Sequence, residues 1–231
     1  MKREQIVKYT GTGLTVFFCI FTAIRVTVTG RTDRLFLSLW SVVLALLPLL
    51  LEKVFSCRLS LPFYLFLQLY TIGPMLGHCW RLYYYTTWWD KLLHISAGVV
   101  FAVLGAYLIE RLGVRKPLAI ALFALCFSIA VSAVWELYEF GADQLFGKDM
   151  QNDRIITRIS SYALGGTPGD VGTIDPIRSV VVNGKNMPGY LDIGLIDSML
   201  DMLVETVGAL VTSLLIWWDK GKFVRIRAVE S

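Results

Sequence analysis

Long apolar runs, separated by short polar segments, follow one another along most of the 231-residue chain. A helix needs about 20 mostly apolar residues to cross the hydrocarbon core of a bilayer. The runs lack the alternation of barrel strands, and backbone groups in lipid must pair within their own helix, so each run predicts a spanning helix. We therefore expect an all-α membrane protein, a single domain over residues 1–231 built as a six-helix transmembrane bundle. The expected spans are 11–29, 35–55, 62–80, 92–108, 117–138 and 198–218.

The distribution of Lys and Arg indicates the orientation of these spans. Twelve of them flank the spans on the side that holds the N-terminus, against four on the opposite side. Charges of the long loop carry little information on orientation, because long loops cross the membrane regardless of charge. We therefore expect a multi-pass protein with both termini in the cytoplasm. The first run ends without a small-x-small cleavage site, so we interpret it as a retained helix rather than a signal peptide.

The hydrophilic segment 147–197 interrupts this pattern and predicts one long extracytoplasmic loop. The β-branched run Val180-Val181-Val182 comes just before Asn183-Gly184, which predicts a short hairpin. A loop of this length in a compact membrane protein is more often functional than incidental. We expect it to cap a site.

Composition agrees with a membrane protein. Apolar residues make up 55% of the chain and charged residues 17%, where a soluble domain carries about 25% charged residues. A soluble protein this apolar would need more core than its length can enclose. The same figures exclude a disordered chain, a fibrous chain and a nucleic-acid-binding domain, although the net charge is +4. The four cysteines form no C-x-x-C pair, and we expect free, buried thiols.

Ionisable residues within the spans are expected at one common depth in the membrane. Placing a charged side chain in a membrane costs free energy, so such residues indicate function. Asp90 and His94 are four apart near the start of the fourth span, so they share a helix face. Acidic residues recur at spacings of three and four near the end of the fifth span and the start of the sixth. All these ends face outward in the expected topology, which predicts an outward-facing polar site. Its members are Asp90, His94, Glu136, Glu139, Asp197 and Asp201, with Glu205, Asp143 and His78 in second rank.

An alternative interpretation makes these residues interfacial, satisfied by water and headgroups. Asp90 and Asp197 fit it, because an acid at a helix N-terminus is stabilised by capping and by the helix dipole. Compared with these two, the residues His94, Glu136, Asp201 and Glu205 lie deeper in their spans, which favours a functional pocket. The tryptophan pairs 88–89 and 217–218 are expected at the headgroup level, as aromatic belt residues are.

Two kinds of chemistry fit such a pocket. Histidine with carboxylates at a spacing of four can bind a divalent metal, Zn²⁺ or Mn²⁺, and hold a water for hydrolysis. In that interpretation the candidate metal ligands are Asp90, His94, Glu136, Glu139, Asp197 and Asp201. His94 is a ligand or base, and Asp201 and Glu136 are ligands or proton acceptors. Without a metal, His94 paired with Asp90 or Glu136 is a general base or proton carrier. The sequence contains no H-E-x-x-H string, nucleophile elbow or P-loop that would name a reaction.

The run from Trp88 to His94 resembles the D-K-x-x-H element that opens a helix in VanZ-like membrane proteins. In that family an acidic helix end with a Gln follows, and then a helix with D-x-x-x-N-x-x-G-A. Glu136 or Glu139 with Gln144, and residues 201–209, match these elements, with Glu205 in place of the Asn. A resemblance over most of the chain, including residues 135–140 and 189–197, is to the YjdF-like bacterial inner-membrane proteins, whose function is unknown.

These resemblances imply a protein of the bacterial plasma membrane with a role near the cell envelope, as in the glycopeptide tolerance linked to VanZ. Together with the polar site they suggest a metal-dependent enzyme acting on a lipid or envelope precursor. The alternatives are a proton- or cation-coupled transporter and a non-catalytic membrane subunit. Two features argue against a transporter. No repeat relates two halves of the chain, and Gly73-Pro74 interrupts only one span, whereas many transporters have a pair of interrupted spans. The sequence predicts contact with a lipid bilayer and leaves substrate and oligomeric state open.

Overall fold

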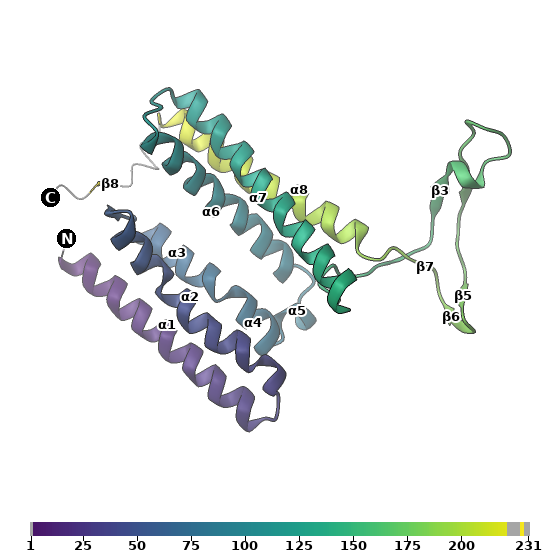
Figure 1. Cartoon of the computed structure of the whole chain (residues 1–231), viewed down its shortest axis with the longest axis horizontal. Helices are drawn as coiled ribbons and strands as arrows, with labels where there is room; N and C mark the ends of the chain where they lie inside the picture. The colour runs from purple at the N-terminus through teal and green to yellow at the C-terminus, as the bar shows by residue number, and fades with distance from the viewer. Residues whose placement is uncertain (1, 221–226, 229–231) are drawn as a thin grey trace. The chain divides into compact units, whose positions relative to one another are not determined.

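The computed structural model describes residues 2–220 and 227–228, and most of them are helical (Figure 1). Contacts between residues divide the chain into two compact units. Unit 1 holds residues 1–131 and 204–231, and unit 2 holds residues 132–203. Two long helices begin in one unit and end in the other, so each unit contains a segment of both.

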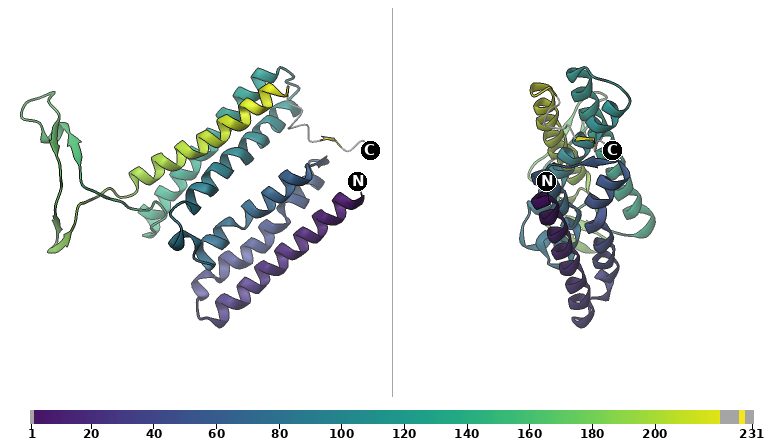
Figure 2. Two further views of the ribbon diagram at one scale, coloured as in Figure 1. Left: turned by 180° about the vertical axis from the view of Figure 1, so that it is seen from behind. Right: turned by 90° about the vertical axis from the view of Figure 1, so that its left-hand side faces the viewer.

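The helices follow the apolar runs closely. Five helical segments among residues 2–220 are long and apolar enough to cross a membrane. In unit 1 the helices α1, α2 and α3 lie side by side, and so do α6 and the unit 1 segments of α7 and α8 (Figures 1 and 2). The helix bounds are α1 Lys2–Val28, η1 Thr32–Arg34, α2 Leu35–Val54, α3 Leu61–Thr71, α4 Gly73–Cys79, α5 Leu82–Tyr85, α6 Trp89–Arg111, α7 Pro117–Phe146 and α8 Leu195–Trp218.

The expected third span, 62–80, is not one helix. α3 ends at Thr71 and α4 begins at Gly73, with Pro74 in its first turn. Proline has no N–H to donate, and its ring clashes with the carbonyl four residues earlier, so a continuous helix cannot pass through it undisturbed. The Trp89 indole donates to the Gly73 carbonyl at 3.3 Å and ties this break to the start of α6. The prediction of one continuous helix here was wrong, and a bundle of six spanning helices is not confirmed.

Small residues bring α6 and α8 into backbone contact within unit 1. A Cβ atom added at Gly98 would lie 2.1 Å from the Glu205 carbonyl oxygen, and one added at Gly208 would lie 2.3 Å from the Ile95 carbonyl oxygen. Ser128 on α7 donates to the Gly98 carbonyl at 3.2 Å. Small side chains allow such close approach between membrane helices. The main chain itself therefore fixes the spacing of α6 and α8.

The cysteines are free, as expected. Cys19, Cys57 and Cys79 are buried in unit 1, where Cys19 and Cys79 belong to one apolar cluster with Val26. The expected burial was wrong for Cys126 on α7, which is exposed.

Unit 2 contains short antiparallel strand pairs, so the all-α expectation was wrong for the long loop. The hairpin predicted at Asn183-Gly184 is confirmed, since Val180 pairs with Met187 and both turn residues have positive φ. Sequence patterns missed the pairs β2–β7 and β3–β4, whose strands are only two or three residues long. The strands are β2 Ile155–Ile156, β3 Ile159–Ser161, β4 Gly172–Ile174, β5 Val180–Val182, β6 Lys185–Met187 and β7 Tyr190–Leu191, with η2 Tyr162–Leu164 between β3 and β4. In unit 1, β1 (Cys57–Arg58) pairs with β8 (Arg227–Ala228).

Candidate functional site

His94 is the buried histidine of the predicted site, and it lies one turn into α6. Its side chain has two carboxylate neighbours in unit 1. Asp90, one turn earlier on the same helix, places Oδ1 3.9 Å from His94 Nε2. The other Asp90 oxygen, Oδ2, accepts from the Lys91 ammonium at 3.3 Å. Asp90 therefore stands between a cation at the helix start and the buried imidazole.

The second neighbour of His94 is Glu205 on α8. Its Oε2 atom lies 3.7 Å from His94 Nδ1, and the residue is only 2% exposed. Its Oε1 atom is buried and has no hydrogen-bond partner among the residues that the structure describes. The distances from the imidazole to Asp90 and to Glu205 both exceed the hydrogen-bond range of about 2.7–3.2 Å. The ring therefore faces one carboxylate at each nitrogen without bonding tightly to either.

The contact between His94 and Glu205 follows from the close approach of their two helices. Gly98 lies one turn after His94 and is the residue that touches the Glu205 backbone. A larger side chain at Gly98 would push α8 away, and the carboxylate with it. The sequence analysis ranked Glu205 second, yet it is the carboxylate that the fold of unit 1 brings to His94 from another helix.

Asp201 lies on α8 one helical turn before Glu205, which places both residues on one face of that helix. It is 1% exposed. The helix alone thus aligns two buried carboxylates along its axis, as the spacing in the sequence predicted.

The two predicted glutamates of α7 belong to unit 2 and are buried. Glu139 accepts a hydrogen bond from the Trp135 indole at 2.9 Å, one turn earlier on the helix. Glu136 lies between Trp135 and Glu139 in the sequence, within the same helix α7. The structure thus gives Glu139 an aromatic partner that the sequence spacing did not reveal.

Asp197 and Asp143 hold the long loop against the helix ends of unit 2. Asp197 Oδ2 accepts from the backbone N–H and the side-chain amide of Asn152, both at 3.0 Å. Arg154 approaches the other Asp197 oxygen at 3.7 Å. Asp143 accepts from the backbone N–H groups of Met150 and Gln151, at 2.7 and 2.9 Å. Both carboxylates are therefore engaged in positioning the loop.

Asp192 is a buried carboxylate of unit 2 that the sequence analysis missed. It accepts from the backbone N–H groups of Arg154 at 2.7 Å, Ile196 at 3.0 Å and Gly194 at 3.4 Å. Burial by itself would raise the pKa of Asp192, but these backbone donors and the Arg154 charge hold its pKa below the ordinary value. An aspartate three residues before the first helical residue, Leu195, is a capping signal that could have identified it.

His78, a second-rank candidate, lies outside the group around His94. Its side chain is exposed and its ring packs on Tyr83 with centroids 4.8 Å apart. Its backbone carbonyl accepts a hydrogen bond from Arg34. These contacts give His78 a packing role at the end of α4.

One protein-family model matches residues 11–221 and is described as a predicted membrane protein, DUF2238. The chain belongs to the DUF2238 family. The match includes all of α2–α8 and every residue of the predicted site. No curated protein and no solved structure matches the chain. Membership in DUF2238 confirms a membrane protein with several apolar helices, while the resemblance to YjdF-like and VanZ-like proteins stays a prediction.

The DUF2238 chain also has a second buried charged group, which the sequence analysis missed. Lys8 on α1 is 3% exposed and forms an ion pair with Glu52 on α2. Lys8 also donates to the Leu59 carbonyl at 2.7 Å and lies over the Tyr64 ring. Lys8 is one of the twelve Lys and Arg residues predicted to flank the spans on the N-terminal side, although Thr12 one turn later is a signal for a polar helix face. Thr12 and Tyr64 share a hydroxyl hydrogen bond of 2.6 Å in the same group.

Proposed function

We propose that this DUF2238 protein is a metal-dependent membrane enzyme with its site around His94. Its substrate is a lipid or cell-envelope precursor at the outer leaflet of a bacterial plasma membrane. One observation carries the proposal: Glu205 is buried beside His94 with one carboxylate oxygen that has no hydrogen-bond partner in the described part of the chain. A buried carboxylate is costly unless something compensates its charge, and a divalent cation does so.

The spacing of the side chains supports a shared ion. Ligands at about 2.1 Å from one tetrahedral metal lie roughly 3.4 Å from each other. The 3.7 Å between His94 Nδ1 and Glu205 Oε2 is nearer to that spacing than to a hydrogen bond. Asp90 faces the opposite ring nitrogen, where carboxylates commonly orient a metal-binding histidine. His94 and Glu205 are therefore the proposed primary ligands, and Asp90 is the residue that orients the ring.

Asp201 is the proposed third ligand, because it lies one turn before Glu205 on the same buried helix face. Glu136 is the proposed proton acceptor. Glu139 and Asp197, which the sequence analysis included in the ligand set, have a supporting role in the proposal because of their bonds to Trp135 and Asn152. The donor set of one imidazole and several carboxylates suits Zn²⁺ or Mn²⁺.

A bound ion of this kind supplies a nucleophilic water at neutral pH, which makes hydrolysis the proposed reaction class. The chain's own groups position that chemistry: Asp90 faces the far nitrogen of His94, and the packing of α8 on Gly98 brings Glu205 to the near one. Cytoplasmic termini, as the Lys and Arg distribution predicts, would place the site at the outer leaflet.

The experiment is a measurement of metal content. The full chain is purified in mild detergent without chelator, and bound transition metals are determined by elemental mass spectrometry. We expect about one Zn or Mn per chain, lost in His94→Ala and in Glu205→Gln. His78→Ala is the matched control, because it removes an exposed histidine and should leave the metal in place. A protein that carries no metal, or His94→Ala with undiminished metal, would contradict the proposal.

A further inference from the structure

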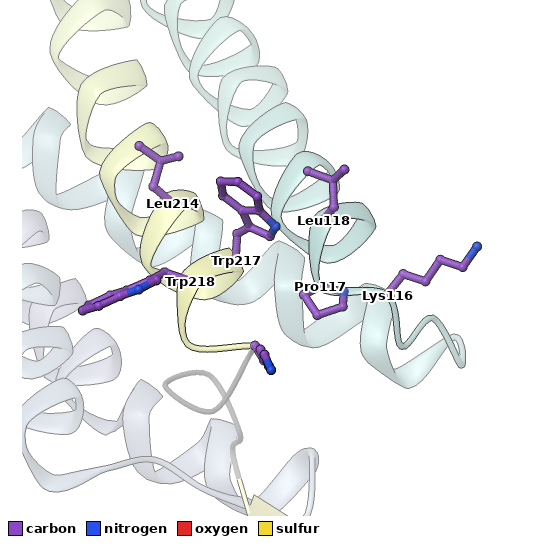
Figure 3. A pocket seen from close by; sticks show the side chains of 7 residues that line it. Lys116, Pro117, Leu118, Leu214, Trp217 and Trp218 are labelled. Atoms are coloured by element: carbon purple, nitrogen blue, oxygen red, sulfur yellow. The ribbon is translucent and has the colours of Figure 1, made fainter.

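Unit 1 has a hollow between the first turn of α7 and the last turn of α8, with a volume of about 810 Å³ (Figure 3). This volume falls within the range of about 300–1,000 Å³ that is typical of ligand pockets. Leu118 and Leu214 line it further along the two helices, and Trp217 and Trp218 line it at the end of α8. These four side chains are exposed, so the hollow is apolar and open.

Two cations stand at the end of this apolar hollow. Lys116 precedes Pro117 at the start of α7, and Lys220 follows the last turn of α8. Asp219 is next to Lys220 in the sequence but is not among the residues that line the hollow. The hollow therefore combines an apolar wall with a positively charged end, and among the described residues no acidic side chain lines it.

The depth of the hollow in the bilayer follows from its residues. Tryptophan and lysine at the ends of spanning helices lie at the headgroup level, and the lysine ammonium extends toward the phosphates. Basic pockets between membrane helices at this level bind anionic headgroups, with about 1 kcal/mol from each lysine near the surface. An apolar wall that continues along α7 and α8 fits acyl chains, which free phosphate lacks.

We propose that this hollow binds one anionic phospholipid from the leaflet on the side of the chain termini. Lys116 and Lys220 contact its phosphodiester, and its acyl chains lie along Leu118 and Leu214. Trp217 and Trp218 pack at the level of the glycerol backbone. A zwitterionic phospholipid binds more weakly, because its cationic group meets the two lysines. This inference is independent of the metal proposed near His94.

The experiment measures lipid retention on the full chain in detergent by native mass spectrometry. The probes are dioleoyl phosphatidylglycerol and dioleoyl phosphatidylcholine at equal concentrations. Lys116→Gln/Lys220→Gln is compared with Lys2→Gln/Lys53→Gln, a control that removes two exposed lysines expected at the same side of the membrane. We expect the wild type to retain phosphatidylglycerol several-fold better than phosphatidylcholine. The first variant should lose about thirtyfold in phosphatidylglycerol affinity and the control less than twofold.

Equal retention of the two lipids by the wild type would overturn the proposal. An equal loss in both double variants would also overturn it, because the effect would then be one of net charge. Displacement of phosphatidylglycerol by millimolar inorganic phosphate would show that the hollow is an anion site rather than a lipid site. Trp217→Ala should weaken both lipids, and unchanged retention in that variant would remove the apolar part of the proposal.

Discussion

Unit 1 buries two groups of ionisable side chains, and they differ in how completely their charges are paired. Around Lys8 every named charge meets a close partner: Glu52 accepts from the ammonium and from the Leu59 backbone N–H at 2.8 Å. Beside His94, by contrast, one oxygen of the buried Glu205 carboxylate lacks a hydrogen-bond partner within the described residues.

The difference separates a structural polar group from a ligand site. A buried network with all its donors and acceptors satisfied makes a fold rigid and specific. A buried carboxylate with an unsatisfied oxygen weakens the fold, so its presence is explained by something that binds it. By this criterion the Lys8 group holds α1, α2 and α3 together, whereas the unpaired Glu205 oxygen is where the proposed cation would bind.

The largest expected effect on stability comes from breaking the ion pair of the Lys8 group. Lys8→Met removes the cation and leaves the half-buried Glu52 carboxylate without its ion-pair partner, so we expect a loss of up to about 3–5 kcal/mol in the free energy of unfolding. The measurement is chemical unfolding of the detergent-solubilised protein. Lys53→Met, at an exposed lysine, is the control and should change stability little. The double variant Lys8→Met/Glu52→Leu should recover most of the loss. Equal stability of Lys8→Met and Lys53→Met would refute the structural role.

A smaller loss is expected when the helices around the second group are separated. Gly98→Ala places a Cβ atom against the Glu205 carbonyl, which must move α6 from α8 at a cost of about 1–3 kcal/mol. We also expect weaker metal binding, because His94 and Glu205 are drawn apart. Gly13→Ala on α1, where nothing lies within 4 Å, is the control and should leave both quantities intact. Metal affinity unaffected by Gly98→Ala would contradict the proposed geometry.

Asp192 in unit 2 offers an intermediate case, a buried carboxylate satisfied by backbone N–H groups rather than by a cation. Asp192→Ala should cost about 0.5–2 kcal/mol locally, as loss of a helix cap does. Because the folded pKa lies below the ordinary value of 3.8, the stabilisation is complete above that pH and is lost as the pH falls through the folded pKa. The measurement is hydrogen exchange of the Gly194 and Ile196 amides, compared between wild type and Asp192→Ala at each pH. If the amides of the wild type stayed better protected at the lowest pH by the same factor, the ionised carboxylate would not be the source of the protection.

The smallest effect on stability is expected at Glu205 itself. Glu205→Gln removes an incompletely paired charge, so without metal the free energy of unfolding should change by less than about 1 kcal/mol. Added Zn²⁺ should raise the thermal midpoint of the wild type and not that of the variant, because an ion stabilises the state that binds it. A large loss of stability in metal-free Glu205→Gln would place the residue with Lys8 as a structural group.

The long helices could be predicted from the sequence because length and apolar content decide them. The break at Gly73-Pro74 was visible as a dipeptide, but the apolar run around it predicted one span. The burial of Lys8 depends on Glu52, 44 residues away in the chain, and no local pattern reveals such a partner. The same residue type is a flanking charge at Lys53 and a buried ion at Lys8.

The candidate site was predictable along each helix and not between helices. Spacings of four correctly placed Asp90 with His94 and Asp201 with Glu205 on common faces. The rank of Glu205 was too low because its approach to His94 depends on how closely α6 and α8 pack, which Gly98 and Gly208 decide. The role of Asp197 at the loop depends on Asn152, whose position follows from the short strands that the sequence did not show.

The two glycine contacts also bear on how this family can change over evolutionary time. Because Gly98 and Gly208 let main chain meet main chain, the separation of α6 and α8 does not depend on the side chains of His94 and Glu205. Those side chains can be exchanged for others without rebuilding the packing that surrounds them. Within DUF2238, one inherited frame of two helices could therefore accommodate different ions or reactions through a few substitutions.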